Sequence, residues 1–148
     1  MARRIIRFLV VFSLGVVSCY TYLNPEWYKN LEINASDVKL AVNNCEKIIS
    51  EIKKYDWDVK VATAIMKAES KCNVNAKGDE DITFEENGRT YGYSVGAFQV
   101  RILPGRENCD TFDLETNVEC AYSIYVDKGR DFTDWSMFLN GKYLDYLE

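Results

Sequence analysis

The chain has 148 residues, of which 47% are hydrophobic and 14% aromatic, and its formal net charge is −5. This composition suits one folded domain with a short N-terminal appendage, and it excludes both a disordered chain and a basic nucleic-acid-binding surface. The sequence contains no histidine. Histidine zinc sites and Ser-His or Cys-His nucleophile systems are therefore excluded, and acid–base chemistry has to come from carboxylates, Lys, Tyr or Cys.

The N-terminus has the pattern of an export signal. Three arginines within the first seven residues precede an apolar run from Phe8 to Val17, and Ser18-Cys19 follow. This order is typical of a bacterial lipoprotein signal, in which Cys19 would be lipidated. An ordinary cleaved signal peptide and an uncleaved anchor helix that continues to Leu23 fit the same residues. All three alternatives place the rest of the chain outside the cytoplasm.

We expect the chain to be organised in three segments. Residues 1–18 would be the signal or anchor, and residues 19–35 a tether in which Asn24-Pro25 breaks any helix. Residues 36–148 would form the folded domain. Contact with a membrane is expected only through the N-terminus.

The other four cysteines form an even set that suits two disulfides in an oxidising compartment. They are Cys45, Cys72, Cys109 and Cys120. No Cys-x-x-Cys pair occurs among them, so we expect no metal site. The sequence allows three pairings. We favour Cys72–Cys109 with Cys45–Cys120, only because this pairing gives one bridge between helices and one between loops.

Two helices are predicted in the first half of the domain. Apolar residues recur at spacings of three and four from Val38 to Ile52, after a cap at Ser36 or Asp37. A second helix is predicted from an N-cap at Asp56 to about Ser70. Its inward stripe consists of Val61, Ala62, Ile65 and Met66.

Glu69 takes the next position on the apolar stripe of the second helix. It follows Ile65 by four residues and Met66 by three, so the helix directs a carboxylate inward at its C-terminal end. Burial and the negative end of the helix dipole both disfavour ionisation, which keeps a glutamic acid protonated near neutral pH. A glutamate that reaches solvent at a fraying helix end fits the same pattern.

The second half begins with a predicted β-hairpin. Two β-prone runs, Ile82–Glu86 and Arg89–Tyr93, flank Asn87-Gly88, which is a strong turn signal. A third helix is predicted after a cap at Asp113, with its end at Gly129. The sequence therefore predicts an α+β fold that is mainly α-helical, with a small β-hairpin and disulfide staples.

Three segments together resemble the lysozyme superfamily. Residues 61–70, which end in Glu69-Ser70, are similar to the catalytic helix of lytic transglycosylases and of goose-type and c-type lysozymes. Residues 94–100 resemble the Gly-x-x-Gln segment that lines the substrate groove in this superfamily. Residues 117–122 and the closing segment from Trp135 are similar to small bacterial transglycosylase-like domains. The resemblance covers roughly residues 45–147 and points to a domain like the soluble lytic transglycosylases.

This resemblance implies a lysozyme-like fold that cleaves β-1,4 glycosidic bonds in peptidoglycan or a related N-acetylated glycan, without a cofactor. Glu69 would be the general acid. The substrate-binding residues that it implies are Ser94, Phe98, Gln99, Tyr125 and Trp135. An amide near a turn equally suits a backbone contact of Gln99, and aromatic residues at such spacings are more often part of a core. Asn117 fits a structural hydrogen bond better than a catalytic role.

The mechanism depends on whether a second carboxylate is present. The position at which c-type lysozymes carry an aspartate is Ser94 here. Asp79 and Asp81 precede the hairpin and would suit an inverting hydrolase, although both also fit solvated loop charges. A lytic transglycosylase needs a single acid, because the C6 hydroxyl of the sugar attacks and leaves a 1,6-anhydro end. The sequence therefore favours transglycosylation.

Two readings without catalysis remain open from the sequence. A lysozyme-like fold can act as a glycan-binding module without turnover, because a fold does not determine a function. The chain would otherwise be a structural, disulfide-stapled domain of the cell surface. Its negative charge gives no long-range attraction to peptidoglycan, which is itself anionic.

Overall fold

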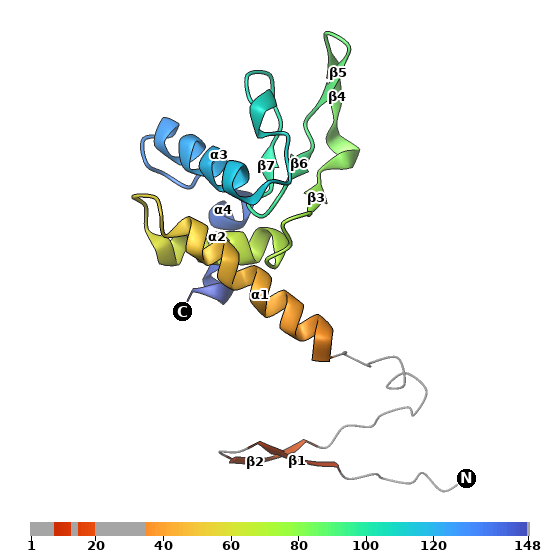
Figure 1. Cartoon of the computed structure of the whole chain (residues 1–148), viewed down its shortest axis with the longest axis vertical. Helices are drawn as coiled ribbons and strands as arrows, with labels where there is room; N and C mark the ends of the chain where they lie inside the picture. Colours follow the sequence, from red (N-terminus) through yellow and green to blue (C-terminus); the bar gives the residue numbers. More distant parts are fainter. Residues whose placement is uncertain (1–7, 13–14, 20–34, 148) are drawn as a thin grey trace, which may run out of the picture. The chain divides into compact units, whose positions relative to one another are not determined.

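The computed structural model describes residues 8–12, 15–19 and 35–147 (Figure 1). The chain divides into two units, which span Met1–Ala35 and Ser36–Glu148.

The first unit contains the residues predicted to form the export signal. Strand β1 (Phe8–Phe12) pairs antiparallel with strand β2 (Gly15–Cys19), so the described part of this segment is extended. Residues 1–7, with the three arginines, and the tether at 20–34 lie outside the described residues. Within the described ranges, no helix is both long and apolar enough to cross a membrane. Signal cleavage, lipidation of Cys19 and an anchor helix therefore stay predictions.

Four α-helices form the framework of the second unit within residues 35–147. They are α1 (Ala35–Ile52), α2 (Val59–Ser70), α3 (Leu114–Asp127) and α4 (Ser136–Leu139). Helix α2 packs against α4 and against a C-terminal 3₁₀ segment, Lys142–Tyr146, so it lies in the middle of the unit (Figure 1). Its buried residues are Ala62, Ala64, Ile65 and Met66.

The predicted helix starts are right at α3 and two residues early at α2. The Asp113 side chain accepts a hydrogen bond from the backbone N–H of Thr116, as the sequence predicts for an N-cap. At α2 the N-cap is Asp58, whose carboxylate accepts from two backbone N–H groups of the first turn. The predicted cap, Asp56, instead forms an ion pair of 2.7 Å with Arg130 from the segment after α3.

Short antiparallel strands form the β region of the second unit. The order of the three-stranded sheet is β3–β6–β7, and the hairpin β4–β5 is separate from it. The strands are β3 (Lys77–Gly78), β4 (Phe84–Glu86), β5 (Arg89–Tyr91), β6 (Ser94–Val95) and β7 (Val100–Arg101). Asn87 and Gly88 have φ angles of 51° and 75°, which is the turn geometry that their sequence predicts. The predicted hairpin is confirmed, although both of its strands are shorter than expected.

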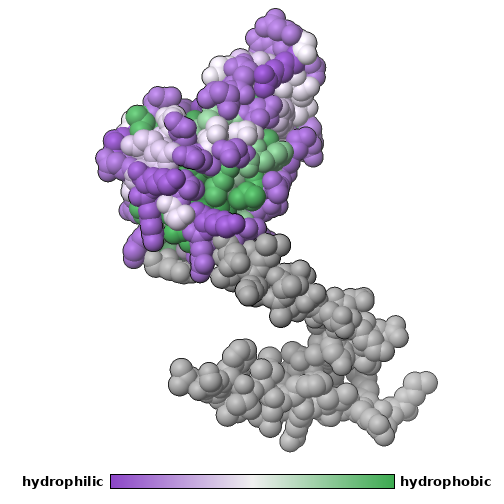
Figure 2. All heavy atoms as spheres, in the orientation of Figure 1, coloured by the Kyte–Doolittle hydropathy of each residue, from purple (hydrophilic) through white to green (hydrophobic). Residues whose placement is uncertain are grey.

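An aromatic cluster forms the centre of the core. Trp57 is 7% exposed, and its ring lies 5.4 Å from that of Phe98 and 5.9 Å from that of Tyr125. Its indole N–H donates to the carbonyl of Ile52, so the one polar group of the side chain is satisfied inside the core. On the face shown in Figure 2 the surface is mostly hydrophilic, with one hydrophobic area near its centre.

Two disulfides staple this unit, but their pairing differs from the one favoured above. Cys45 is bonded to Cys72, and Cys109 is bonded to Cys120. The first bridge links α1 to the residue that lies two positions after α2 ends. The second links the loop before α3 to α3 itself. The favoured pairing was wrong because the preference for one helix–helix and one loop–loop bridge ignored which segments pack together. The helix-dominated, disulfide-stapled α+β fold is confirmed.

We expect the Cys45–Cys72 bridge to stabilise the domain more than the Cys109–Cys120 bridge. The two bridges span sequence separations of 27 and 11 residues, respectively. Loop-closure entropy then gives losses of about 3.5 and about 2.8 kcal/mol in the free energy of unfolding. Urea unfolding of the Cys45→Ala/Cys72→Ala and Cys109→Ala/Cys120→Ala double variants measures both values. A larger loss for the second variant would contradict this order.

Candidate active site

Glu69 lies in the last turn of α2, half-buried, with its carboxylate near α4. The backbone N–H of Met137 in α4 donates a hydrogen bond of 3.3 Å to Oε1 of Glu69. The helix ends one residue later, and Lys71 and Cys72 follow with φ angles of 52° and 63°. Two consecutive left-handed residues turn the chain sharply away from the helix axis, and the disulfide of Cys72 holds that turn.

The surroundings of Glu69 favour its protonated form. Desolvation by burial is the main cause that raises the pKa of its carboxyl above the ordinary value of 4.5. The hydrogen bond from Met137 acts in the opposite direction, and the negative charge of Asp79 raises the pKa further. This is the balance that a carboxylic acid needs in order to donate a proton at mildly acidic to neutral pH.

Asp79 is exposed, yet a buried serine holds it in place. Ser94 is 3% exposed, and its hydroxyl donates a hydrogen bond of 2.5 Å to Oδ2 of Asp79. Strand pairing explains the contact, because Ser94 in β6 lies opposite Gly78, the residue before Asp79. The Ser94 hydroxyl is therefore engaged by a carboxylate. Asp81, the other aspartate before the hairpin, is exposed and lies in the 3₁₀ turn Glu80–Ile82.

Gln99 lies in the turn between β6 and β7. Its φ angle is 47°, and its side-chain amide donates a hydrogen bond of 3.0 Å to the carbonyl of Gly96. A Cβ added at Gly78 would lie 2.5 Å from Oε1 of Gln99, so this amide packs directly against β3. The structure thus brings Gln99 next to the residue that precedes Asp79.

Three of the predicted sugar-binding aromatic residues lie in the core. Phe98 is 0%, Tyr125 is 7% and Trp135 is 4% exposed. The indole N–H of Trp135 donates a hydrogen bond of 2.9 Å to the carbonyl of Phe98. Trp135 also lines a small pocket together with Gln99. The rings of Phe98 and Trp135 contact each other, and the ring of Tyr125 contacts those of Trp57 and Phe132. Binding of the three side chains to sugar stays a prediction.

Comparison with known protein families gives one match. A family model described as a lysozyme-like domain matches residues 53–137, which is more than half of the chain. The chain belongs to this lysozyme-like family. The match includes all of α2 with Glu69, the β region and the start of α4. Searches among curated proteins and among solved structures returned no match.

Membership of this family indicates glycan cleavage in general, as the resemblance implied. Glu69 lies within the matched residues, and its role as the catalytic acid stays a prediction. Within residues 35–147 the lysozyme-like domain contains no group of three or more side chains arranged to hold a metal ion.

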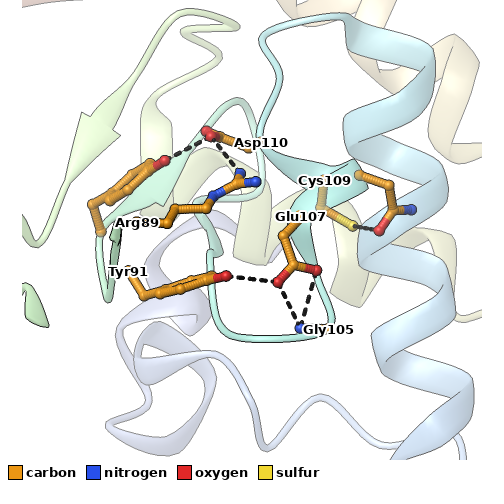
Figure 3. A network of polar contacts seen from close by, with 8 residues as sticks. Arg89, Tyr91, Gly105, Glu107, Cys109 and Asp110 are labelled. Carbon is orange, nitrogen blue, oxygen red and sulfur yellow. Dashed lines mark hydrogen bonds and ion pairs between the residues drawn. The ribbon is translucent and has the colours of Figure 1, made fainter. Parts of the chain in front are cut away.

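A polar network joins the hairpin to the loop before α3 (Figure 3). Arg89 forms an ion pair of 3.1 Å with Asp110, which also accepts a hydrogen bond of 2.6 Å from the hydroxyl of Tyr93. The hydroxyl of Tyr91 donates to Glu107 at 2.8 Å. These contacts fix the β region of the lysozyme-like domain against the loop that the Cys109–Cys120 bridge ties down.

Two features of the site had no signal in the sequence. The donor to Glu69 is a backbone N–H, which any residue except proline would supply at position 137. The network of Figure 3 joins residues that are 16 to 21 positions apart, and no local periodicity reports such pairs. Exposed polar residues of a hairpin look the same in sequence whether they face solvent or another loop.

We expect the contribution of Glu69 to the free energy of unfolding to fall as pH rises through the pKa of this group. Because the pKa of this group is raised in the folded state, the folded protein binds more protons than the unfolded one above the ordinary value of 4.5. The contribution of Glu69 to the free energy of unfolding is therefore largest while Glu69 is protonated in both states, and it decreases until the pH passes the pKa of the folded state. Glu69→Gln removes this contribution.

Urea unfolding of the wild type and of Glu69→Gln from about pH 4 to about pH 8 measures the effect. The difference in the free energy of unfolding between the two proteins should change across this range in favour of the variant. Glu46→Gln, which removes a carboxylate from an exposed position on α1, is the matched control. Parallel curves for the wild type and Glu69→Gln would contradict the role of burial.

Proposed function

We propose that this domain cleaves β-1,4 glycosidic bonds in a peptidoglycan-type glycan with Glu69 as general acid and base. The observation that carries the proposal is the half-buried carboxyl of Glu69 with its raised pKa, in a domain of the lysozyme-like family. A glycosidic oxygen is a poor leaving group and has to be protonated as its bond breaks. The raised pKa of Glu69 supports its role as the donor of that proton.

The proposed reaction is a lytic transglycosylation. Glu69 gives its proton to the glycosidic oxygen while the bond from this oxygen to C1 breaks through an oxocarbenium-like transition state. The ionised carboxylate then takes the proton from the C6 hydroxyl of the same sugar. The oxygen of that hydroxyl forms the new bond to C1. Glu69 ends the cycle protonated, and the product carries a 1,6-anhydro ring. The internal attack has the advantage of an intramolecular reaction, and no water is consumed.

Hydrolysis is the second candidate, and the position of Asp79 favours it. This carboxylate is close enough to raise the pKa of Glu69, and the hydroxyl of Ser94 orients it. An inverting glycosidase uses a second carboxylate at roughly 6.5 to 9.5 Å from the acid in order to activate water. Asp79 is one of the two aspartates that the sequence offered for this role, since Ser94 stands where c-type lysozymes carry theirs. The nature of the product therefore decides between the two mechanisms.

The two disulfides and the glycan-acting family together indicate an extracytoplasmic location. We propose export by the N-terminal segment, with lipidation of Cys19 as the anchor and secretion after signal cleavage as the alternative. A cell-wall glycan in the same compartment would be the substrate. A glycan-binding module without turnover is the remaining alternative, and loss of activity on substitution of Glu69 tests it.

The Glu69→Gln variant should lose glycan cleavage and keep its fold and its binding of glycan. The amide is isosteric with the acid but has no acidic proton to give to the leaving oxygen. Release of soluble fragments from purified peptidoglycan measures the activity, and Glu46→Gln is again the control. Retention of more than about a tenth of the wild-type rate, which is a barrier change below roughly 1.4 kcal/mol, would exclude Glu69 as the acid.

Mass spectrometry of the fragments should show 1,6-anhydro ends, which are about 18 mass units lighter than hydrolysed ends. Asp79→Asn should leave this product unchanged and retain most of the rate, because internal attack needs no second carboxylate. Incorporation of heavy oxygen from labelled water, together with a loss of about a hundredfold or more in Asp79→Asn, would show hydrolysis with Asp79 as the base.

A further inference from the structure

Arg101 in β7 differs from the other arginines of the domain. Within residues 35–147 every other arginine forms an ion pair, whereas the guanidinium of Arg101 is exposed and has neither an ion pair nor a hydrogen bond. The paired arginines are Arg89 with Asp110, Arg106 with Asp134 and Arg130 with Asp56. The chain contains 23 acidic residues, so a shortage of carboxylates does not explain the unpaired side chain.

Arg101 lines the pocket of about 170 Å³ that also contains Gln99 and Trp135. The acidic side chain that lines this pocket, Asp134, is neutralised by Arg106 at 3.0 Å and by Lys128 at 2.9 Å. The pocket is therefore positively charged on balance, although the chain as a whole is acidic. Its volume lies below the roughly 300 Å³ at which small-molecule pockets begin, which suits a substituent better than a whole sugar ring.

The pocket adjoins the candidate active site through the three-stranded sheet. Arg101 lies directly opposite Ser94 in the register of β6 and β7, and Ser94 lies opposite Gly78 in β3. Side chains of directly opposite residues project from the same face of a sheet, about 5 Å apart at their Cβ atoms. The side chain of Arg101 thus projects from the face of the sheet on which Ser94 donates its hydrogen bond to Asp79. The negative charge of Asp79 in turn raises the pKa of Glu69.

A second connection runs through α4. Trp135, which lines the pocket, is the N-cap residue of α4, and Met137 in the same helix donates its backbone N–H to Glu69. The pocket and Glu69 are therefore connected to the same two elements, the sheet through Asp79 and α4 through Met137. A glycan that places one bond at Glu69 would have its neighbouring substituents close to the pocket.

We propose that Arg101 binds a carboxylate carried by a substituent of the glycan and thereby makes the domain selective for acidic glycans. This inference rests on the proposed glycan-cleaving function. A guanidinium offers two parallel N–H donors that match a carboxylate, and Gln99 lies in the same pocket. In peptidoglycan the carboxylate comes from the lactyl ether of strands without peptides or from the stem peptide. A neutral polymer of N-acetylglucosamine has the same β-1,4 backbone and no such group.

The binding experiment uses the full chain with Glu69→Gln, so that no substrate is consumed. Affinity is measured for three probes, namely peptide-free glycan strands, peptide-bearing strands and neutral N-acetylglucosamine oligomers. Arg101→Gln is then added to the Glu69→Gln chain. The double variant should bind carboxylate-bearing strands about tenfold or more weaker than Glu69→Gln alone, and its affinity for the neutral oligomers should change by less than about twofold. With Arg101→Lys the affinity for carboxylate-bearing strands should lie between those of the proteins with Arg101 and with Arg101→Gln, because lysine keeps the charge and lacks the paired donors.

Lys60→Gln is the matched control, because it removes the same charge from an exposed position in the first turn of α2, at the opposite end of the helix from Glu69. It should leave all three affinities unchanged. A loss confined to peptide-free strands identifies the lactyl carboxylate, and a loss confined to peptide-bearing strands identifies the peptide carboxylate. Either result, or both together, supports the proposal.

The cleavage rates of the protein with Glu69 intact separate this inference from the proposed function. If the wild type cleaves strands and Arg101→Gln affects neutral and acidic probes equally, the role of Arg101 is wrong and the glycan-cleaving function stands. If the wild type neither binds nor cleaves any probe, both are wrong. Selective loss on acidic strands alone is the expected result.

Discussion

The carboxyl of Glu69 has to remain partly desolvated although its helix ends one residue later. A last helical turn frays easily, and fraying would hydrate the acid and return its pKa toward the ordinary value. Three contacts oppose this. The hydroxyl of Ser70 bonds back to the carbonyl of Met66, the disulfide from Cys72 ties the exit of α2 to α1, and the N–H of Met137 fixes the carboxylate from the other side. Two of these three contacts join the end of α2 to segments that are distant in sequence.

A buried asparagine holds the turn between β6 and β7, on the side of the site that contains Asp79. Asn117 of α3 is 1% exposed; its side chain accepts from the N–H of Phe98 and donates to the carbonyl of Val95, both at 3.1 Å. A Cβ at Gly96 would lie 2.3 Å from Nδ2 of Asn117, so the turn can approach the helix only with glycine there. This turn carries Gln99 against Gly78 and so positions the segment that contains Asp79.

The charges of the domain divide into those that hold the structure and those that are left for a ligand. Asp134 joins two cations, and hydrogen bonds from Lys128 and Arg106 hold its pKa below the ordinary range, although partial burial acts against them. Such pairs each contribute little to stability, but here they neutralise the acidic side chain that lines the pocket of Arg101. An acidic chain that acts on an anionic polymer has to obtain its affinity from local groups, since its overall field is repulsive. The unpaired Arg101 is such a group.

Local patterns in the sequence identified several features that a few neighbouring residues encode. Spacings of three and four residues identified α1 to α3 and the inward side of α2 with Glu69, Asn87-Gly88 identified the hairpin, and four cysteines predicted two disulfides. The start of α2 was misplaced because Asp56 and Asp58 are equally good caps by composition. Only the fold shows that Arg130 engages Asp56.

The tertiary structure decided which distant groups meet. Four kinds of contact join separate segments of the chain. They are the two disulfides, the contact of Ser94 with Asp79, the strand register that aligns Gly78, Ser94 and Arg101, and the hydrogen bond from Met137 to Glu69 across 68 residues. Periodicity and turn signals report the conformation of a short stretch of backbone. Contacts between stretches depend instead on how helices and strands pack, and many packings share the same local pattern. For this protein, the sequence was enough to place Glu69 on the inward side of its helix, and the fold supplied its surroundings.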